Sequence, residues 1–297
     1  MLRSASSRGR GYVSSAASVT MAVLTLVITI GAAAWGIAAG GTLHGAAPDP
    51  VPASAPAAEF SSARALDRIR IVAREPHPMG SPANAAVRDY LVSELSRFGL
   101  TPQIQRATAA YYPLSGIVQG GTSENVVARL RGTNGDAKSF LIAAHSDSVP
   151  TSPGATDNGA GVAALLETLR ALKAGPALRN DVILLFTDGE ERGLIGARAF
   201  VDGHPWADDI GAVLNLDTRG NTGPAVMLAT NDESGWVVDE FAKAAPYPMT
   251  TSDAVASFKR SGGNSDLSVF LDASLAGLQV STTGGGLALP RCAGQRG

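Results

Sequence analysis

The sequence predicts an α/β fold, a three-layer sandwich in which helices cover both faces of a mixed, largely parallel central β-sheet. The prediction rests on three short apolar runs, at 139–144, 181–186 and 210–216. Nearly continuous apolar runs of this length are typical of strands that are buried on both faces. A helix with an apolar stripe is expected over 159–173, between the first two runs, and a further helix before the third. Strands that alternate with helices favour a parallel sheet.

Four more elements are expected before these runs: helices over 61–74 and 82–98, and strands over 103–108 and 125–130. The second helix has the clearest signals. Ser81 is a suitable N-cap, and Pro82 stands at the first helical position. Apolar residues then recur on one face of the helix until Gly99 ends it.

The composition restricts the classes of function. The chain has 297 residues, of which 45% are apolar, which is enough for one large α/β domain. A net charge of −2 leaves no basic field for nucleic acid. The single cysteine, Cys292, excludes an internal disulfide and a cysteine-based zinc finger. A metal site would therefore use His, Asp and Glu, and the chain has only four histidines.

The first sixty residues are expected to lie outside the fold. Residues 16–40 are apolar and uncharged, and are long enough for a transmembrane anchor. Arginines in residues 1–15 place that end in the cytoplasm and the rest of the chain on the extracytoplasmic side of the cell membrane. A cleaved signal peptide is the alternative, although its apolar region is usually only ~7–15 residues long. Residues 41–60 form a Pro/Ala-rich linker, and 61–297 a single domain.

Ionisable residues follow each of the three buried runs. The first run is followed by His145 and Asp147, the second by Asp188, Glu190 and Glu191, and the third by Asp217. Asp157 comes just before the helix that is expected to begin at 159. Ligands of open α/β sheets bind at the carboxyl ends of the strands, so these side chains should converge. One histidine with several carboxylates suits zinc, manganese or cobalt at an open hydrolytic site.

Each of these residues also has an ordinary structural interpretation. A single histidine at a strand end is usually a hydrogen-bonded structural residue. Asp157 is by itself a common N-cap, and Glu190 with Glu191 can be a solvated acidic pair. Their joint occurrence at successive strand ends favours the metal site, because so many carboxylates close together are costly without a cation.

These motifs resemble those of the co-catalytic zinc aminopeptidase group of clan MH, which includes leucyl-type aminopeptidases and the endoplasmic-reticulum metallopeptidase. The resemblance lies in four strings: His145-Ser-Asp147, Asp157-Asn-Gly, Asp188-Gly-Glu190-Glu191 and Asn215-Leu-Asp217. The string PHPMGSPANAAVRDYL at 76–91 also resembles the membrane-anchored members. The resemblance implies a zinc-aminopeptidase-like fold and a peptide substrate cleaved at its free N-terminus.

The resemblance also implies a role for each site residue. His145, Asp157 and Asp217 would bind a first zinc ion, and Asp157 with Glu191 a second. Asp147 would orient the imidazole of His145. Glu190 would be the general base, which takes a proton from a zinc-bound water and returns it to the leaving amine.

The sequence departs from this group near its C-terminus. The group has a fifth ligand there, a histidine in a Tyr-His string, whereas this chain reads STTGGGLALPRCAGQRG after Ser265-Asp266. We therefore expect a weak second zinc site and low activity. If the codons of Leu289 and Pro290 are read one base later, they can encode Tyr-His. One hypothesis is therefore that a frameshift has replaced the family's C-terminal string. The nucleotide sequence around Gly286 tests this hypothesis.

Fold and ligands leave other functions open. Glutaminyl cyclisation and carboxypeptidase action use the same fold. A catalytically inactive ectodomain that has lost its metal is the non-enzymatic alternative. Retention of the whole carboxylate cluster argues against that last interpretation, because a scaffold does not need one.

Overall fold

A computed structural model describes residues 49–284, except for 112–117, 136, 219, 221, 232–234, 247, 251, 253–254, 257 and 259–263. The anchor predicted over 16–40 and its flank 1–15 lie outside the described residues, as does the C-terminal string from 285 onward. Among the residues that are described, no helix is long and apolar enough to cross a membrane.

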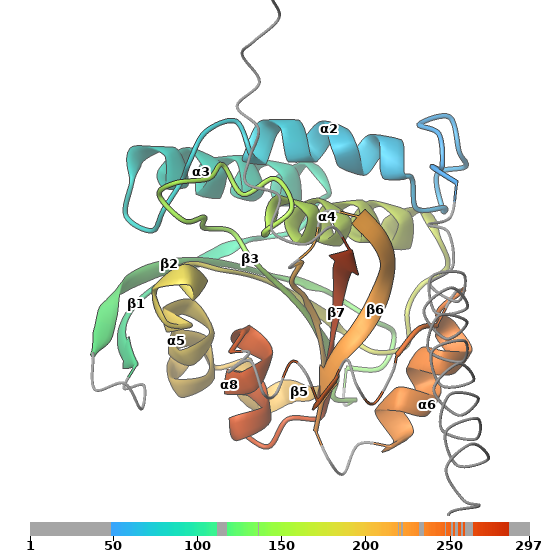
Figure 1. Ribbon diagram of the computed structural model, residues 1–297. Helices are drawn as coiled ribbons and strands as arrows, with labels where there is room; N and C mark the ends of the chain where they lie inside the picture. Colours follow the sequence, from blue (N-terminus) through green and yellow to red (C-terminus); the bar gives the residue numbers. More distant parts are fainter. Residues whose placement is uncertain are drawn as a thin grey trace, which may run out of the picture. The chain divides into compact units, whose positions relative to one another are not determined.

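One mixed sheet runs through the domain, with the strand order β1-β2-β4-β3-β5-β7-β6 (Figure 1). The strands are β1 (Gln103–Tyr111), β2 (Gln119–Leu130), β3 (Ser139–His145), β4 (Val182–Thr187), β5 (Ile210–Leu216), β6 (Thr222–Thr230) and β7 (Gly277–Gly284). The neighbours β4, β3, β5 and β7 are parallel. The pairs β1–β2, β2–β4 and β6–β7 are antiparallel. The predicted mixed α/β sheet is confirmed, with its parallel part in the middle.

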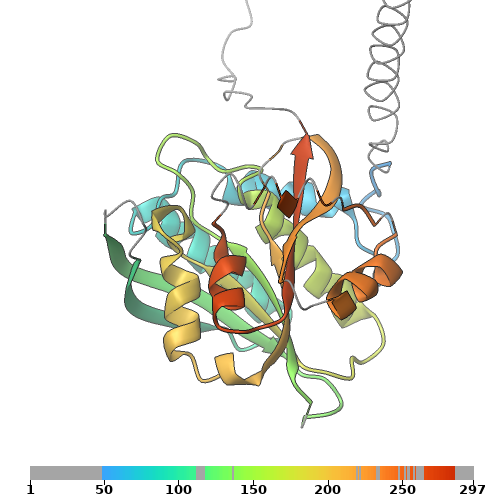
Figure 2. The same ribbon diagram turned by 60° about the horizontal axis from the view of Figure 1, so that its bottom comes forward.

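Helices cover both faces of this sheet, which gives the predicted three layers (Figures 1 and 2). One face carries α2 (Ser62–Val72), α3 (Pro82–Arg97) and α4 (Gly159–Ala174). The other carries α5 (Ile195–Gly203) and α8 (Asp266–Asp272). A further helix, α6 (Gly235–Ala244), packs through Val237 against Leu278 of β7.

The three helices with predicted bounds begin and end within two residues of those of α2, α3 and α4. The first two strands are longer than predicted. β1 continues to Tyr111 and β2 begins at Gln119, where the two pair with each other as an edge hairpin. This stretch of β2 contains Gly120 and Gly121 and is partly exposed, so it lacks the apolar pattern that indicates a buried strand.

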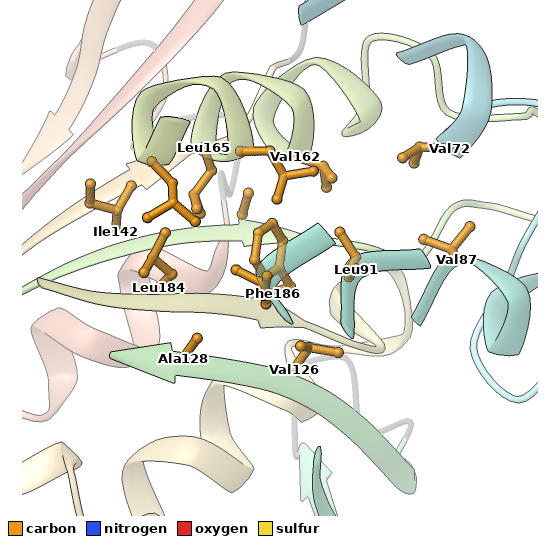
Figure 3. Close-up of a cluster of buried hydrophobic side chains, with 14 of the residues drawn as sticks. Val72, Val87, Leu91, Val126, Ala128, Ile142, Val162, Leu165, Leu184 and Phe186 are labelled. Carbon is orange, nitrogen blue, oxygen red and sulfur yellow. The ribbon is translucent and has the colours of Figure 1, made fainter. Parts of the chain in front are cut away.

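A hydrophobic core between the sheet and α4 holds this helix in place, and α4 begins next to the candidate site. Figure 3 shows Val162 and Leu165 of α4 above Ile142 of β3 and Leu184 and Phe186 of β4. All of these side chains are buried. Burial of each contributes about 1.5–3 kcal/mol, so the first turn of α4 is held firmly over the sheet.

A buried carboxylate joins α2, α4 and the chain before α2. Glu167 of α4 is fully buried, and its Oε1 accepts hydrogen bonds from the Ser61 amide (3.0 Å), from Nε of Arg64 (2.9 Å) and from Arg170 (2.8 Å). The two guanidinium groups also donate to backbone carbonyls between residues 53 and 59. The last part of the predicted linker therefore lies against the domain.

These hydrogen bonds set the charge of Glu167. Burial by itself would raise the pKa of this carboxyl. The hydrogen bonds from Arg170, Arg64 and Ser61 outweigh burial and hold the pKa below its usual value. Glu167 therefore favours its charged form in the folded protein more than in the unfolded chain.

We predict that Glu167→Gln lowers the free energy of unfolding at pH 7 by about 3 kcal/mol, because removal of one partner from a buried ion pair leaves the other charges uncompensated. Urea unfolding of the two proteins measures the difference. Because the pKa of Glu167 is lowered by folding, its contribution is complete above the unfolded-state value of about 4.3. It should be lost as the pH falls through the lower folded-state value.

The matched control is Glu240→Gln, which removes an exposed ion pair with Lys243 on α6. Exposed pairs contribute little, so this variant should unfold like the wild type. Equal destabilisation by the two substitutions at pH 7, or a Glu167 effect that persists in acid, would contradict the assignment.

Candidate metal centre

The residues predicted for a metal site meet at the carboxyl ends of the parallel strands. His145 is the last residue of β3, and Glu190 and Glu191 lie in a short 3-10 helix after β4. Asp217 directly follows β5, and Asp157 lies two residues before α4. The structure thus brings together side chains that are up to 72 positions apart in the sequence (145 to 217).

His145 lies at the centre of these contacts. Its Nε2 atom is 3.0 Å from Oδ1 of Asp157 and 4.0 Å from Oδ1 of Asp217. Its Nδ1 atom is 3.0 Å from the backbone carbonyl oxygen of Asp147 and 3.6 Å from Oδ1 of the same residue. One ligand atom each of His145, Asp157 and Glu191 lie within 4.8 Å of one another. Asp147 therefore contacts the Nδ1 side of the imidazole, and the Nε2 side points toward the carboxylates of Asp157 and Asp217.

Asp157 is positioned by the residue that follows it. Asn158 is the N-cap of α4, and its Oδ1 accepts a hydrogen bond from the Gly161 amide (3.2 Å). Its Nδ2 donates to the carbonyl oxygen of Leu216 at the end of β5 (2.7 Å). A Cβ at Gly161 would lie 2.3 Å from Asn158 Oδ1, so the close approach requires glycine. Asn158 thus ties the start of α4 to the strand that carries Asp217.

Asp147 holds the loop that carries the two glutamates. Its Oδ1 accepts a hydrogen bond from the Glu190 amide (3.1 Å), and its Oδ2 accepts one from the Glu191 amide (3.3 Å). The turn before them uses Gly189 with φ of +82°, a left-handed conformation that favours glycine. One buried carboxylate therefore contacts both the imidazole of His145 and the backbone of the glutamate loop.

Asp188 attaches this loop to other elements and does not belong to the group of His145, Asp157 and Glu191. Its carboxylate accepts hydrogen bonds from the Glu124 amide (2.9 Å) and from Nδ2 of Asn84 (3.1 Å). Its own amide donates to Oδ1 of Asn125 (3.0 Å). Burial raises the pKa of Asp188 to about 6. The residue links the loop after β4 to α3 and β2.

Asp266 belongs to the same charge cluster, although the sequence did not identify it as a site residue. It is buried at the start of α8, and its Oδ2 accepts a hydrogen bond from Oγ1 of Thr187. Its buried Oδ1 has no hydrogen-bond partner in the described part of the chain. Burial raises the pKa of Asp266 to about 7, and the charges of Asp217 and Asp147 act in the same direction. The only sequence signal was the Ser265-Asp266 string, which by itself does not place the residue at the site.

The cluster carries an excess of negative charge. Burial raises the pKa of Glu190 well above its usual range, and burial together with Asp157 raises that of Glu191 to about 7. Burial opposes protonation of His145, but hydrogen bonds to Asp147 and Asp157 raise its pKa well above the usual value. Buried carboxylates this close together require a compensating cation or protons.

The residues present fit a divalent metal ion. An imidazole nitrogen and carboxylate oxygens are ligands of zinc, cobalt and manganese at hydrolytic sites. Tetrahedral zinc with bonds of about 2.0–2.1 Å would place its ligand atoms roughly 3.4 Å apart. The ligand atoms of His145, Asp157 and Glu191, which lie within 4.8 Å of one another, would therefore need only a slight contraction to bind metal. The carboxyl of Asp266 is exposed to the same excess of negative charge, and its buried Oδ1 has no hydrogen-bond partner among the described residues.

The other described histidines bond elsewhere. The Nδ1 atom of His77 lies 2.9 Å from the carbonyl oxygen of Glu75, and the His77 backbone exchanges hydrogen bonds with Ser148 (2.9 and 3.3 Å). His204 follows α5, and its Nδ1 accepts a hydrogen bond from the Trp206 amide (3.1 Å). Neither belongs to the group around His145.

A three-layer α/β sandwich with an imidazole–carboxylate cluster at the strand ends suits a metal-dependent hydrolase. Within that class, the sequence model of peptidase family M28 matches residues 125–288, which is more than half of the chain. The chain belongs to peptidase family M28. The resemblance predicted from the motifs is thus confirmed, and the chain is a metallopeptidase by family.

Curated relatives include membrane proteases. The vacuolar membrane protease of Candida dubliniensis is 36% identical over 217 residues, which cover 71% of this chain and 23% of that protein. Endoplasmic reticulum metallopeptidase 1 of Mus musculus is 32% identical over 209 residues, which cover 65% of this chain and 23% of that protein. The chain spans about a quarter of the length of these relatives.

Solved structures with the same fold include two kinds of enzyme. A zinc aminopeptidase from Bacillus subtilis has a TM-score of 0.58 and 16% identity, and the match covers 75% of this chain and 85% of that one. A glutaminyl cyclase from Porphyromonas gingivalis has a TM-score of 0.55 and 22% identity, with coverage of 74% and 83%. At these identities the similarity concerns the fold, which both chemistries share.

We predict that Asn158→Ala weakens zinc binding about tenfold or more, because the residue next to Asp157 loses its hydrogen bond to the end of β5. Supporting residues of metal ligands typically have effects of about 10–100-fold. Isothermal titration of the metal-stripped protein with zinc measures the affinity. Ser81→Ala is the matched control, since Ser81 is the N-cap of α3. Loss of a cap costs about 1 kcal/mol in either variant. Equal zinc affinities in the two variants would contradict the role of Asn158.

Proposed function

We propose that this chain is a membrane-anchored, zinc-dependent aminopeptidase that hydrolyses the peptide bond next to a free N-terminus. The observation that carries the proposal is the convergence of His145, Asp157 and Glu191 on one point, in a chain that belongs to peptidase family M28. The aminopeptidase fold of the Bacillus subtilis enzyme supports it.

In this proposal the site residues have distinct roles. His145, Asp157 and Asp217 hold a first zinc ion, and Asp157 with Glu191 holds a second. Asp147 orients the imidazole from the Nδ1 side, as the 3.0 and 3.6 Å contacts indicate. Zinc bound there supplies positive charge that lowers the pKa of water to about 7 and polarises the substrate carbonyl.

Glu190 is the general base. Its backbone is fixed by Asp147, and burial and neighbouring carboxylates raise its pKa, as is typical of groups that exchange protons near neutral pH. Its carboxylate takes the proton of the attacking water and delivers it to the nitrogen of the leaving amine. Because the Glu190 amide is held in place, the carboxylate needs little rearrangement between these two transfers.

The second metal position has fewer ligands than the first. Among the residues that the structure describes, Asp157 and Glu191 are the side chains assigned to it in the proposal, since His77 and His204 bond elsewhere. We therefore expect weak binding of the second ion and reduced turnover by this chain.

The membrane anchor rests on the sequence and on the relatives. Residues 16–40 form the span, with 1–15 in the cytoplasm and the domain 61–297 on the extracytoplasmic side of the membrane. The names of the curated relatives place them at the vacuolar membrane and in the endoplasmic reticulum, which supports a membrane location for this chain.

Turnover of aminoacyl-nitroanilides by the metal-stripped and zinc-loaded full-length chain tests the function. We expect hydrolysis only in the loaded form. Glu190→Gln should lower kcat by about 100-fold or more without loss of bound zinc, because a general base contributes about 10²–10⁴-fold. The matched control, Glu240→Gln, changes an exposed glutamate on α6 and should leave kcat unchanged.

Metal content and a second substrate separate the alternatives. Close to two zinc ions per chain would contradict the weak second site, and absence of bound zinc would contradict the peptidase proposal. A peptide with N-terminal glutamine distinguishes the chemistries, since a cyclase would release ammonia from it and leave the nitroanilides intact.

A further inference from the structure

Met79 lies between two glycines that belong to different parts of the fold. A Cβ at Gly121 of β2 would lie 2.7 Å from Cε of Met79, and one at Gly189 would lie 2.5 Å from its Sδ atom. Both values are too short for a van der Waals contact, so the thioether fills the space that side chains at these two positions would need. Ile195 of α5 lies beside both glycines, at 3.6 and 3.4 Å from the same Cβ positions. Met79 therefore connects the edge hairpin to the loop that carries the two glutamates.

The backbone on both sides of Met79 is attached to loops of the candidate metal centre. The His77 amide donates to Oγ of Ser148 (2.9 Å), and the Ser148 amide donates to the His77 carbonyl oxygen (3.3 Å). Further along the chain, Nδ2 of Asn84 donates to Oδ1 of Asp188 (3.1 Å). Ser148 follows β3 and Asp188 follows β4. The segment that carries Met79 is therefore attached at both of its ends.

The loop that Met79 covers has an unfavourable backbone conformation. Gly189 and Gly193 have φ of +82° and +103°, and Leu194, which has a side chain, has φ of +60°. Left-handed residues in close succession persist only where the surrounding structure holds them. Leu194 is buried in the hydrophobic cluster on the α5 side of the sheet, and the Ile195 amide donates to the Gly189 carbonyl oxygen (3.1 Å). Core packing thus holds the far end of the loop, and Met79 covers the end next to the glutamates.

We propose that Met79 is a positioning residue for the general base Glu190. Its thioether keeps the turn at Gly189 in place, and Glu190 directly follows that turn. A displacement of about 1 Å at a reacting group can lower a rate about 100-fold, so a loosely held loop would slow the proton transfer. Methionine suits this place because its unbranched, flexible side chain fills an irregular gap between two backbones. The inference rests on the role of Glu190 in the proposed function and adds the residue that holds it.

Met79 lies outside the hydrophobic core. It is partly buried, and it does not belong to the clusters of buried hydrophobic side chains that the described residues form. Its loss should therefore affect the glutamate loop more than the stability of the domain. A residue with an ordinary packing role would differ, because its loss would leave the activity per folded molecule unchanged.

Met79→Ala and Met79→Leu test the proposal. In the zinc-loaded full-length chain, we expect Met79→Ala to lower kcat for aminoacyl-nitroanilides about tenfold, with KM and bound zinc unchanged. Met79→Leu should keep about half or more of the wild-type kcat, because leucine has nearly the same volume. In the metal-stripped proteins, the amides of Leu194 and Ile195, which bond to carbonyl oxygens of the loop, should exchange with deuterium about tenfold faster in Met79→Ala. In Met79→Leu they should exchange at the wild-type rate.

Gly121→Ala is a second variant that acts through the same contact. Its added methyl group would meet Cε of Met79, so it should lower kcat severalfold by itself and have no further effect in the Met79→Ala background. Gly120→Ala is the matched control, because the atoms nearest to a Cβ there belong to Ala109 and Ala110 of β1. It should leave kcat unchanged. If Met79→Ala does not fold, equal kcat values of Gly121→Ala and Gly120→Ala would still overturn the inference.

The outcomes separate this inference from the proposed function. A wild-type chain that does not hydrolyse the nitroanilides would overturn the general-base role of Glu190 and, with it, this inference. An active wild type together with normal kcat and normal exchange in Met79→Ala would overturn this inference alone. An equal effect of Gly121→Ala in both backgrounds, or slow turnover by Met79→Ala with normal exchange of the loop amides, would overturn it as well.

Discussion

The excess of buried carboxylates around His145 is the constraint on which the site depends. Burial raises the pKa values of Glu190, Glu191 and Asp266, and the negative charges of neighbouring acids act in the same direction. Such an arrangement persists in a folded protein only if the surrounding structure holds it together. The contacts of Asp147 and Asn158 do this by tying the loops to one another through backbone groups. The cluster is thus ready to receive positive charge at one point.

The rest of the fold supplies the rigidity that those loops need. The β3 and β4 strands end side by side with His145 opposite Thr187, so the imidazole and the glutamate loop leave the sheet together. Packing of α4 on the sheet fixes the helix start that Asn158 caps. Asp188 adds a second attachment, to α3 and β2, below the same loop. The loops that carry Asp157 and the two glutamates are therefore attached to buried structure.

The parts predicted from sequence are those with a local signal. Apolar runs identified β3, β4 and β5, and an apolar stripe identified α4, because buried surfaces leave a clear pattern in the sequence. The N-cap of α4 is Asn158, however, and not Asp157, which the sequence offered as a cap. The same logic placed His145, Asp157, Glu191 and Asp217 at one edge of the sheet. Asp266 was missed because β7 lies between β5 and β6, and nothing local in the sequence indicates that α8 begins beside Thr187, the residue of β4 that pairs with His145. Arg64 and Arg170 look like surface charges until their buried partner on α4 is known.

One continuous set of contacts leads from the chain before the fold to the candidate site. The segment of residues 53–59 is bound by Arg64 and Arg170, both of which bond to Glu167 in the middle of α4. At the end of α2, Ala73 lies against the first turn of α4, where a Cβ at Gly159 would be 3.7 Å from it. Asp157 is two residues earlier. Side-chain contacts through α2 and α4 therefore join the N-terminal segment to a metal-ligating loop. Because Glu167 is fully buried between the two arginines, this path fixes where the chain before α2 lies on the domain relative to α4 and the loop that precedes it.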